Sequence, residues 1–201
     1  MSWKHLFSRS LKAQPERLHF AAHSHHLWPD ASHAGHMAAW DDAAVLADQK
    51  WDRIMGPVWS AAQHHVADEL KLPDPATLCF APNTHDFLVR LVSALPMRPV
   101  RVLATDGEFH SFRRQMTRWV EAGEVLLETV SPGSLLETAR AGQFDLIFAS
   151  HVLFNSGTIL FDLEGLANLS RPEGPWVVID GYHGFMAVET DLSSFADRIF
   201  Y

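Results

Sequence analysis

The sequence has one cysteine, Cys79, among its 201 residues. A single thiol cannot form an internal disulfide, which is typical of proteins from a reducing compartment. The N-terminus has no continuous apolar segment of the kind found in signal peptides, and no apolar run approaches the roughly 18 residues that a membrane-spanning helix needs. These absences predict a cytoplasmic protein with no membrane partner.

Positive charge is also scarce. Lys and Arg together number 16 against 24 Asp and Glu, and the formal net charge is -8 at pH 7. Because nucleic acids and anionic membranes attract basic surfaces, this balance argues against both as the main partner. The hydrophobic content of 47% predicts a globular protein with a sizeable core.

The first part of the chain is expected to be helical. Residues 30–70 are rich in Ala, Trp and His at helical spacing, and the two prolines of "PDPAT" close the segment. Near its end, apolar residues share one helix face, namely Val58, Trp59, Ala62, Val66 and Leu70. The sequence therefore predicts a helical N-terminal arm over residues 1–74.

From residue 75 onward, short apolar runs alternate with helical stretches. The runs are "TLCF", "VRVLAT", "EVLLETV", "FDLIFAS", "WVVID" and "RIFY". An apolar stripe from Phe87 to Leu95, preceded by "PNT", predicts a helix between the first two runs. Such alternation is typical of a parallel sheet covered by helices, so we expect residues 75–201 to form an α/β domain. The chain contains neither G-x-G-x-x-G nor G-x-x-x-x-G-K-[ST].

Polar and aromatic side chains follow these runs. Asn83 and Thr84 come after "TLCF", and Phe109 comes after "VRVLAT". Asp180 ends "WVVID", and His183 follows it. Because ligands bind outside the carboxyl ends of strands in open parallel sheets, we expect these residues to converge on one edge. In the alternative interpretation, Asn83 and Thr84 form only a helix N-cap, and Phe109 is a core residue.

Asp180 is the most informative of these residues. A carboxylate at the end of an apolar strand loses hydration unless a cation or a hydrogen-bond donor meets it. Pyridoxal phosphate suits the whole set, because its phosphate fits a helix N-terminus, its flat ring fits an aromatic stack, and its pyridine nitrogen stays protonated beside an ionised aspartate. We therefore predict that Asp180 pairs with that nitrogen and that His183 lies near the ring.

Five segments together resemble the class V aminotransferase-like branch of the fold-type-I pyridoxal-phosphate enzymes, closest in motifs to the kynureninases. The segments are "HFAAHSHHLWP", "APNTHDFLVRLVSAL", "GEFHSF", "SHVLFNSG" and "DGYHG". The similarity covers residues 18–201. It implies a PLP-dependent transferase-like (aspartate aminotransferase type) α/β large domain, a homodimer and an amino-acid substrate. The implied reaction is amino-group transfer, or cleavage of a C–C or C–S bond by a hydrolase or lyase.

The resemblance also implies a role for each cofactor-binding residue. Thr84, with Asn83 beside it, would hold the phosphate, and Phe109 would lie over the pyridine ring. Asp180 would pair with the ring nitrogen, and His183 would lie near the oxygen side of the cofactor.

Other positions extend the resemblance or depart from it. His110 and Asn155 are further candidates for the same pocket. Kynureninases typically carry Phe-Pro-Ser/Thr-Asp at the ring-stacking segment, whereas here Phe112 replaces the aspartate. Their Asn-Ser-Leu-Gly loop corresponds to "HSHH" at residues 23–26. Both departures argue against kynurenine as the substrate.

The lysine that forms the Schiff base in this family is expected outside the chain. It follows the strand that corresponds to "ADRIFY" by a few residues, which places it beyond Tyr201. The lysines present are Lys4, Lys12, Lys50 and Lys71. None of them lies at a predicted strand end near Asp180. We therefore expect a truncated copy or a part of a longer enzyme, without its C-terminal small domain and inactive as it stands.

Two other functions are left open by the sequence. One is a non-catalytic module that keeps the cofactor pocket and binds the cofactor noncovalently. The other is a metal site, since imidazole suits zinc, copper and nickel; its candidate ligands are the histidines of "HSHH" with His33, His36, His64 and His65. The absence of H-E-x-x-H and of a cysteine pair argues against it, and we expect no metal.

Overall fold

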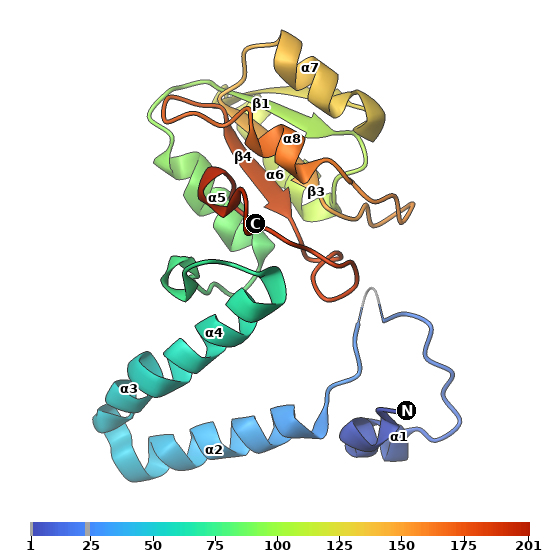
Figure 1. The fold of residues 1–201 in the computed structure, drawn as a ribbon, viewed down its shortest axis with the longest axis vertical. Coiled ribbons are helices and arrows are strands. Elements are labelled where there is room, and N and C mark those ends of the chain that lie inside the picture. Colours follow the sequence, from blue (N-terminus) through green and yellow to red (C-terminus); the bar gives the residue numbers. More distant parts are fainter. Residues whose placement is uncertain (1, 23–24) are drawn as a thin grey trace. The chain divides into compact units, whose positions relative to one another are not determined.

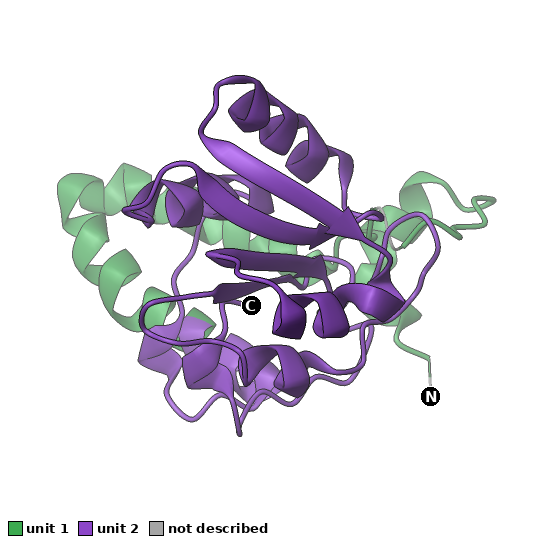
Figure 2. Ribbon diagram, turned by 90° about the horizontal axis from the view of Figure 1, so that it is seen from above, with its two compact units in different colours: residues 1–62 green, residues 63–201 purple. Residues whose placement is uncertain are grey.

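The computed structural model describes residues 2–22 and 25–201. The chain divides into two compact units, residues 1–62 and residues 63–201 (Figure 2). Helix α4 (Trp59–Leu70) crosses the division in sequence. Across the described residues, no helix is both long enough and apolar enough to span a membrane.

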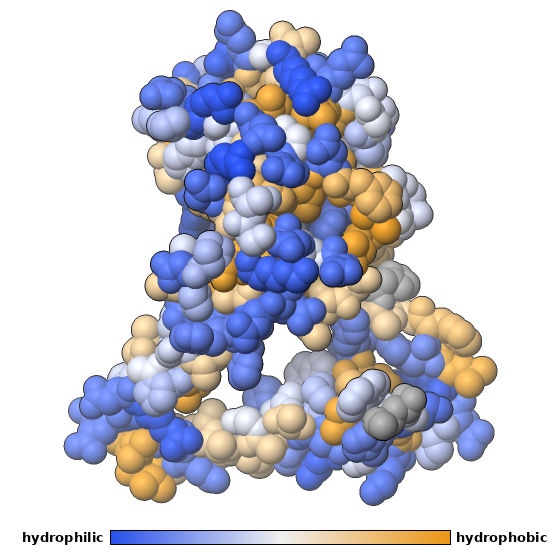
Figure 3. Space-filling model, viewed as in Figure 1, coloured by the Kyte–Doolittle hydropathy of each residue, from blue (hydrophilic) through white to orange (hydrophobic). Residues whose placement is uncertain are grey.

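The unit of residues 1–62 is helical, and none of its described residues is buried. Large apolar side chains such as Trp40 and Val45 are exposed on it. Figure 3 shows hydrophobic residues at the surface among hydrophilic ones. Pro57 lies in a π-helical turn, as expected for a residue that lacks an N–H group and clashes with the preceding turn. The elements are α1 (Ser8–Ala13), α2 (Asp30–Leu46), α3 (Lys50–Arg53) and the start of α4, with 3-10 turns at Lys4–Phe7 and Ala47–Gln49 and the π-helical turn at Ile54–Val58.

The unit of residues 63–201 is built on a four-stranded parallel sheet (Figure 1). Its strands are β1 (Val100–Thr105), β2 (Val125–Val130), β3 (Leu146–Ser150) and β4 (Trp176–Asp180). They lie in the order β2-β1-β3-β4, and Ser150 is opposite Asp180. Phe200 adds one parallel bridge to Val178 on β4. Since every pairing is parallel, the carboxyl ends of the strands share one edge.

Helices cover both faces of this sheet. Leu146 and Phe148 of β3 pack with α5 and α6, whereas Ile147 packs in a second core with α7 and α8. Because successive residues point to opposite faces and both faces are buried, the strands are continuous apolar runs in the sequence. The helices are α5 (Thr84–Ala94), α6 (His110–Glu121), α7 (Leu135–Ala141) and α8 (Leu163–Ala167).

The α/β fold class predicted from the sequence is confirmed. Four of the apolar runs form β1 to β4, and the helix predicted before the first of them is α5. Two strand predictions were wrong. "TLCF" forms no strand, because Pro75–Thr77 is a 3-10 turn capped by Asp74 and Phe80 is exposed. "RIFY" contributes only the bridge at Phe200. A four-residue apolar run does not reveal whether a sheet edge is available to pair with it.

Candidate functional site

Three neighbouring strand ends supply the site. The residues after β1, β3 and β4 lie at the same edge of the sheet, because these strands are parallel neighbours. Phe109 follows β1 and is the N-cap residue of α6. His151 directly follows β3, and its backbone N–H donates to the carbonyl of Asp180 at 2.9 Å. The ends of β3 and β4 are therefore held together.

Phe109, Phe154 and His183 form a cluster of rings at this edge. The centroid of Phe109 lies 5.8 Å from that of His183 and 5.3 Å from that of Phe154. Phe154 lies 5.2 Å from His183. Two residues that the sequence singled out, Phe109 and His183, are thus side by side. Partly exposed rings of this kind offer a face on which another flat ring can stack.

Asp180 ends β4, as expected, and is partly buried. Its Oδ1 atom accepts a hydrogen bond from the backbone N–H of Tyr182 at 3.0 Å. Burial raises the pKa of the Asp180 carboxyl, while the Tyr182 bond and the nearby His183 act in the opposite direction. A positive charge held against this carboxyl would favour its ionised form. The site therefore suits a ligand with a protonated nitrogen.

A buried glutamate that the sequence did not single out lies behind this edge. Glu108 is 1% exposed. Its Oε1 accepts hydrogen bonds from the Thr105 hydroxyl at 2.6 Å and the Ser150 N–H at 2.9 Å, and its Oε2 accepts from the Ser150 hydroxyl at 2.6 Å. Burial raises the pKa of Glu108, and the charge of Asp180 adds to the rise. Glu108 thus links the ends of β1 and β3. In the sequence, only its position next to Phe109 in "GEFHSF" indicated that Glu108 could lie near the site.

Asn83 and Thr84 lie at the start of α5, which packs on the same face of the sheet as α6. The Oδ1 atom of Asn83 accepts a hydrogen bond from the backbone N–H of Asp86 at 2.9 Å. Asn83 is therefore the N-cap residue, which was one of its two interpretations. A capped helix start still carries the positive end of the helix dipole and favours an anion there. The role of Asn83 and Thr84 in phosphate binding stays a prediction.

The remaining candidates lie at the margin of the site or outside it. The ring of His110 lies 4.0 Å from that of Phe109, and Asn155 is in an exposed turn after β3. Phe112 is a core residue, 3% exposed, and its ring stacks on Phe148 with 4.2 Å between centroids. This position faces the core, so an aspartate here would need a different local packing.

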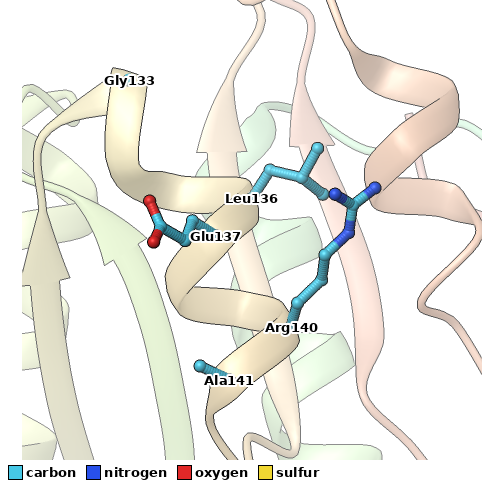
Figure 4. A pocket seen from close by; sticks show the side chains of 5 residues that line it. All are labelled: Gly133, Leu136, Glu137, Arg140 and Ala141. Carbon is cyan, nitrogen blue, oxygen red and sulfur yellow. The ribbon is translucent and has the colours of Figure 1, made fainter.

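Two other features give little support for a site. In the described part of the chain, no three His, Cys, Asp or Glu side chains are placed to hold a metal ion. His23 of "HSHH" lies outside the described residues. A shallow hollow on α7 contains none of the strand-end residues (Figure 4). It is lined by Gly133, Leu136, Glu137, Arg140 and Ala141.

Lys71 is the only lysine within residues 63–201. Its Nζ atom lies 3.2 Å from Asp191 Oδ2 and 3.5 Å from Glu189 Oε1. The hydrogen bond and charge of Asp191, helped by Glu189, raise the pKa of Lys71. Its amine therefore stays protonated near neutral pH and is a poor nucleophile.

The chain matches no known family profile and no curated protein. Its structure does resemble solved structures. A mutant of C-DES with glycine covalently linked to its PLP cofactor aligns with a TM-score of 0.78 and 16% identity, over 98% of this chain and 54% of that chain. A complex of the cystine C–S lyase C-DES with its product cysteine persulfide aligns with a TM-score of 0.70 and 16% identity, over 87% of this chain and 49% of that chain. The cysteine desulfurase CsdA from Escherichia coli aligns with a TM-score of 0.67 and 14% identity, over 85% of this chain and 46% of that chain.

At 14–16% sequence identity, the structural similarity establishes a shared fold and nothing more. The fold is the PLP-dependent transferase-like one, as the sequence predicted. The chain spans about half the length of the solved structures that it resembles. The kynureninase branch stays a prediction, since the neighbours named above are a C–S lyase and a desulfurase.

Proposed function

We propose that residues 63–201 form the cofactor-binding part of a class V aminotransferase-like, pyridoxal-phosphate-dependent enzyme that acts on an amino acid. One observation carries the proposal. Asp180 is a partly buried carboxylate at the end of a parallel strand and interacts with the charge of His183, whose ring lies 5.8 Å from that of Phe109. On a PLP-dependent transferase-like fold, this arrangement favours a protonated pyridine ring as the ligand.

The residues present fit this cofactor. Asp180 accepts one backbone hydrogen bond, and an ionised carboxylate has further lone pairs for a protonated ring nitrogen. Phe109 offers a ring face for stacking, and the polar ring of His183 lies 5.8 Å from it. The start of α5, at Asn83 and Thr84, suits the phosphate.

When bound, pyridoxal phosphate supplies an electron sink for the negative charge that develops beside the amino carbon of a substrate. The role of this chain would be to bind and orient the cofactor. The Asp180 carboxylate would hold a proton on the ring nitrogen, Phe109 would fix the plane of the ring, and His183 would form a polar contact at its edge.

Among amino acids, a sulfur-containing substrate is the first class to test. A cystine C–S lyase and a cysteine desulfurase share the fold, and Phe112 stands where kynureninases carry an aspartate. Amino-group transfer and kynureninase-like C–C cleavage are the alternatives. Release of persulfide or sulfide from cystine or cysteine, compared with cleavage of kynurenine, separates these reactions in the whole enzyme. We also propose that the whole enzyme is a homodimer, as the resemblance implies.

A non-catalytic cofactor-binding module is the second candidate, and the ion pairs of Lys71 argue against this amine as a covalent partner of the cofactor. It predicts that the 201-residue chain binds the cofactor noncovalently. After incubation with pyridoxal phosphate and reduction with borohydride, peptides containing Lys71 should keep their mass. A cofactor-labelled Lys71 peptide would contradict this candidate.

Binding of pyridoxine 5′-phosphate tests the main proposal. This compound has the ring and phosphate of the cofactor but no aldehyde that reacts with amines. We expect saturable binding to the 201-residue chain, followed by calorimetry or by quenching of tryptophan fluorescence. Asp180→Asn should weaken the affinity about tenfold or more, because it removes a charge-assisted hydrogen bond to the ring nitrogen.

Asp197→Asn is the matched control, since it makes the same chemical change at a side chain that is 85% exposed. It should leave the affinity unchanged. The proposal fails if the unmodified chain shows no saturable binding, or if Asp180→Asn binds as tightly as the unmodified chain.

A further inference from the structure

Two glycines flank the residues Tyr182 and His183 in the turn after β4. In this 181–184 turn, the N–H of Gly184 donates to the carbonyl of Gly181 at 2.9 Å. A Cβ atom on Gly181 would lie 2.4 Å from Cε1 of Tyr201, and one on Gly184 would lie 2.6 Å from Nδ1 of His151. Neither glycine has a positive φ. Close approach of two rings, rather than backbone conformation, therefore requires glycine at both positions.

The two rings that contact these glycines, those of His151 and Tyr201, are hydrogen-bonded to each other. Nδ1 of His151 and the hydroxyl of Tyr201 are 2.9 Å apart. His151 is 4% exposed, and burial lowers its pKa, so the imidazole is neutral near pH 7. Burial also raises the pKa of Tyr201, which keeps the phenol protonated. A neutral imidazole and a phenol form a stable hydrogen bond without a net charge.

The same two residues come from the segments on either side of β4. His151 extends β3, and its backbone N–H donates to the carbonyl of Asp180. Tyr201 follows Phe200, whose carbonyl accepts from the N–H of Ile179 at 2.8 Å. The end of β4 is thus fixed by backbone hydrogen bonds on both sides, and the turn that follows rests on the bonded rings.

We propose that His151 and Tyr201 are positioning residues, which together form a platform that sets the orientation of the 181–184 turn and so of the Asp180 carboxylate and the His183 imidazole. The inference rests on the proposed function, in which Asp180 meets a ring nitrogen. Asp180 Oδ1 is bonded to the N–H of Tyr182 within this turn. A shift of the turn therefore moves the carboxylate.

Ligand discrimination separates this role from plain packing. The two probes are pyridoxine 5′-phosphate and its analogue with C–H in place of the ring nitrogen. Both make the same phosphate and stacking contacts, but only the first can bond to Asp180. We expect the unmodified chain to prefer the pyridine about tenfold, which corresponds to one charge-assisted hydrogen bond.

Tyr201→Phe keeps the ring against Gly181 and removes only the hydroxyl. We expect it to reduce the preference for the pyridine to about threefold or less, because a misplaced carboxylate forms a weaker hydrogen bond. Gly184→Ala should do the same, since its new methyl group must displace the His151 ring. Gly133→Ala is the matched control, because a Cβ there meets nothing within 4 Å. It should keep the full preference.

The outcomes are distinct. An undiminished preference in Tyr201→Phe overturns the positioning role. An equal loss of affinity for both probes also overturns it, because the pair would then support the fold without acting on Asp180. If the unmodified chain binds neither probe, or binds both equally, the proposed function itself fails.

Discussion

Asp180 and Glu108 are carboxylic acids at neighbouring strand ends with different surroundings. The Asp180 carboxyl is partly buried and accepts one hydrogen bond from the backbone, whereas the Glu108 carboxyl is fully buried and accepts three hydrogen bonds. Burial raises the pKa of both. Asp180 faces the proposed ligand, while Glu108 holds the backbone from which Phe109 and His151 extend.

Removal of the Glu108 carboxyl should destabilise the fold. Glu108→Ala leaves the Thr105 hydroxyl and both Ser150 donors without an acceptor, so we expect a loss of about 2–3 kcal/mol in the free energy of unfolding. Glu108→Gln should cost less, because its amide can accept from one group and donate to a hydroxyl. Urea unfolding measures both variants. Glu137→Ala, at an exposed position on α7, should change stability by less than about 0.5 kcal/mol; an equal loss there would contradict the expectation.

Glu108 should also contribute a pH dependence of known sign. Its folded-state pKa lies above the ordinary value of 4.5. Its contribution to stability is therefore fully present below pH 4.5 and is lost as the pH rises through the folded-state pKa. The free energy of unfolding of Glu108→Gln, relative to the unmodified chain, should accordingly increase between pH 4 and pH 7. Parallel urea-unfolding results for the two proteins at every pH would rule this out.

Asp191 provides a control of opposite sign. Hydrogen bonds from Ser193, together with Lys71, lower the pKa of Asp191 from 3.8 to about 2. Its contribution is present above pH 3.8 and is lost as the pH falls toward 2. Asp191→Asn should therefore approach the stability of the unmodified chain only at acid pH.

At the scale of elements, α5 combines a structural start with a proposed binding role. Its apolar face, including Leu88 and Val92, packs into the core shared with α6. Its first turn is capped by Asn83. A helix start can be capped and still bind an anion, because the two roles use different groups. The capping side chain accepts from one backbone N–H, whereas the helix dipole and the other free N–H groups attract the anion.

Two substitutions at Asn83 separate these purposes. Asn83→Ala removes the cap and should lower the free energy of unfolding by about 1 kcal/mol. Asn83→Asp keeps a capping oxygen and should retain stability, but it places a negative charge where the phosphate is expected. Urea unfolding and titration with pyridoxine 5′-phosphate measure the two effects. If Asn83→Asp binds this ligand as well as the unmodified chain does, the phosphate does not lie at α5.

At the scale of the whole molecule, the two units differ in their interiors. Residues 63–201 contain two apolar cores, one on each face of the sheet. The described residues of 1–62 contribute no buried side chain, and α2 has none along its whole length. Because local stability depends on buried apolar contacts, the units should open independently and at different free energies.

Hydrogen exchange followed by mass spectrometry tests this difference. In the 201-residue chain, amides of α2 should exchange much faster than those of β3, whose five residues are all buried. Limited proteolysis should cut within residues 1–62 before it cuts β1 to β4. Equal protection of α2 and β3 would show that residues 1–62 are covered in solution.

The sequence by itself determined the α/β class, the four strands and α5, because buried parallel strands and amphipathic helices leave local patterns. It also placed Asp180 at a strand end and put Phe109 and His183 on the same edge. It did not determine the fate of "TLCF", the burial of Glu108, or the bond between His151 and Tyr201. These depend on contacts between distant residues: Glu108 meets Ser150, which is 42 positions away, and His151 meets Tyr201, which is 50 positions away. Only the packing of three strand ends brings such groups together, and no local periodicity records it.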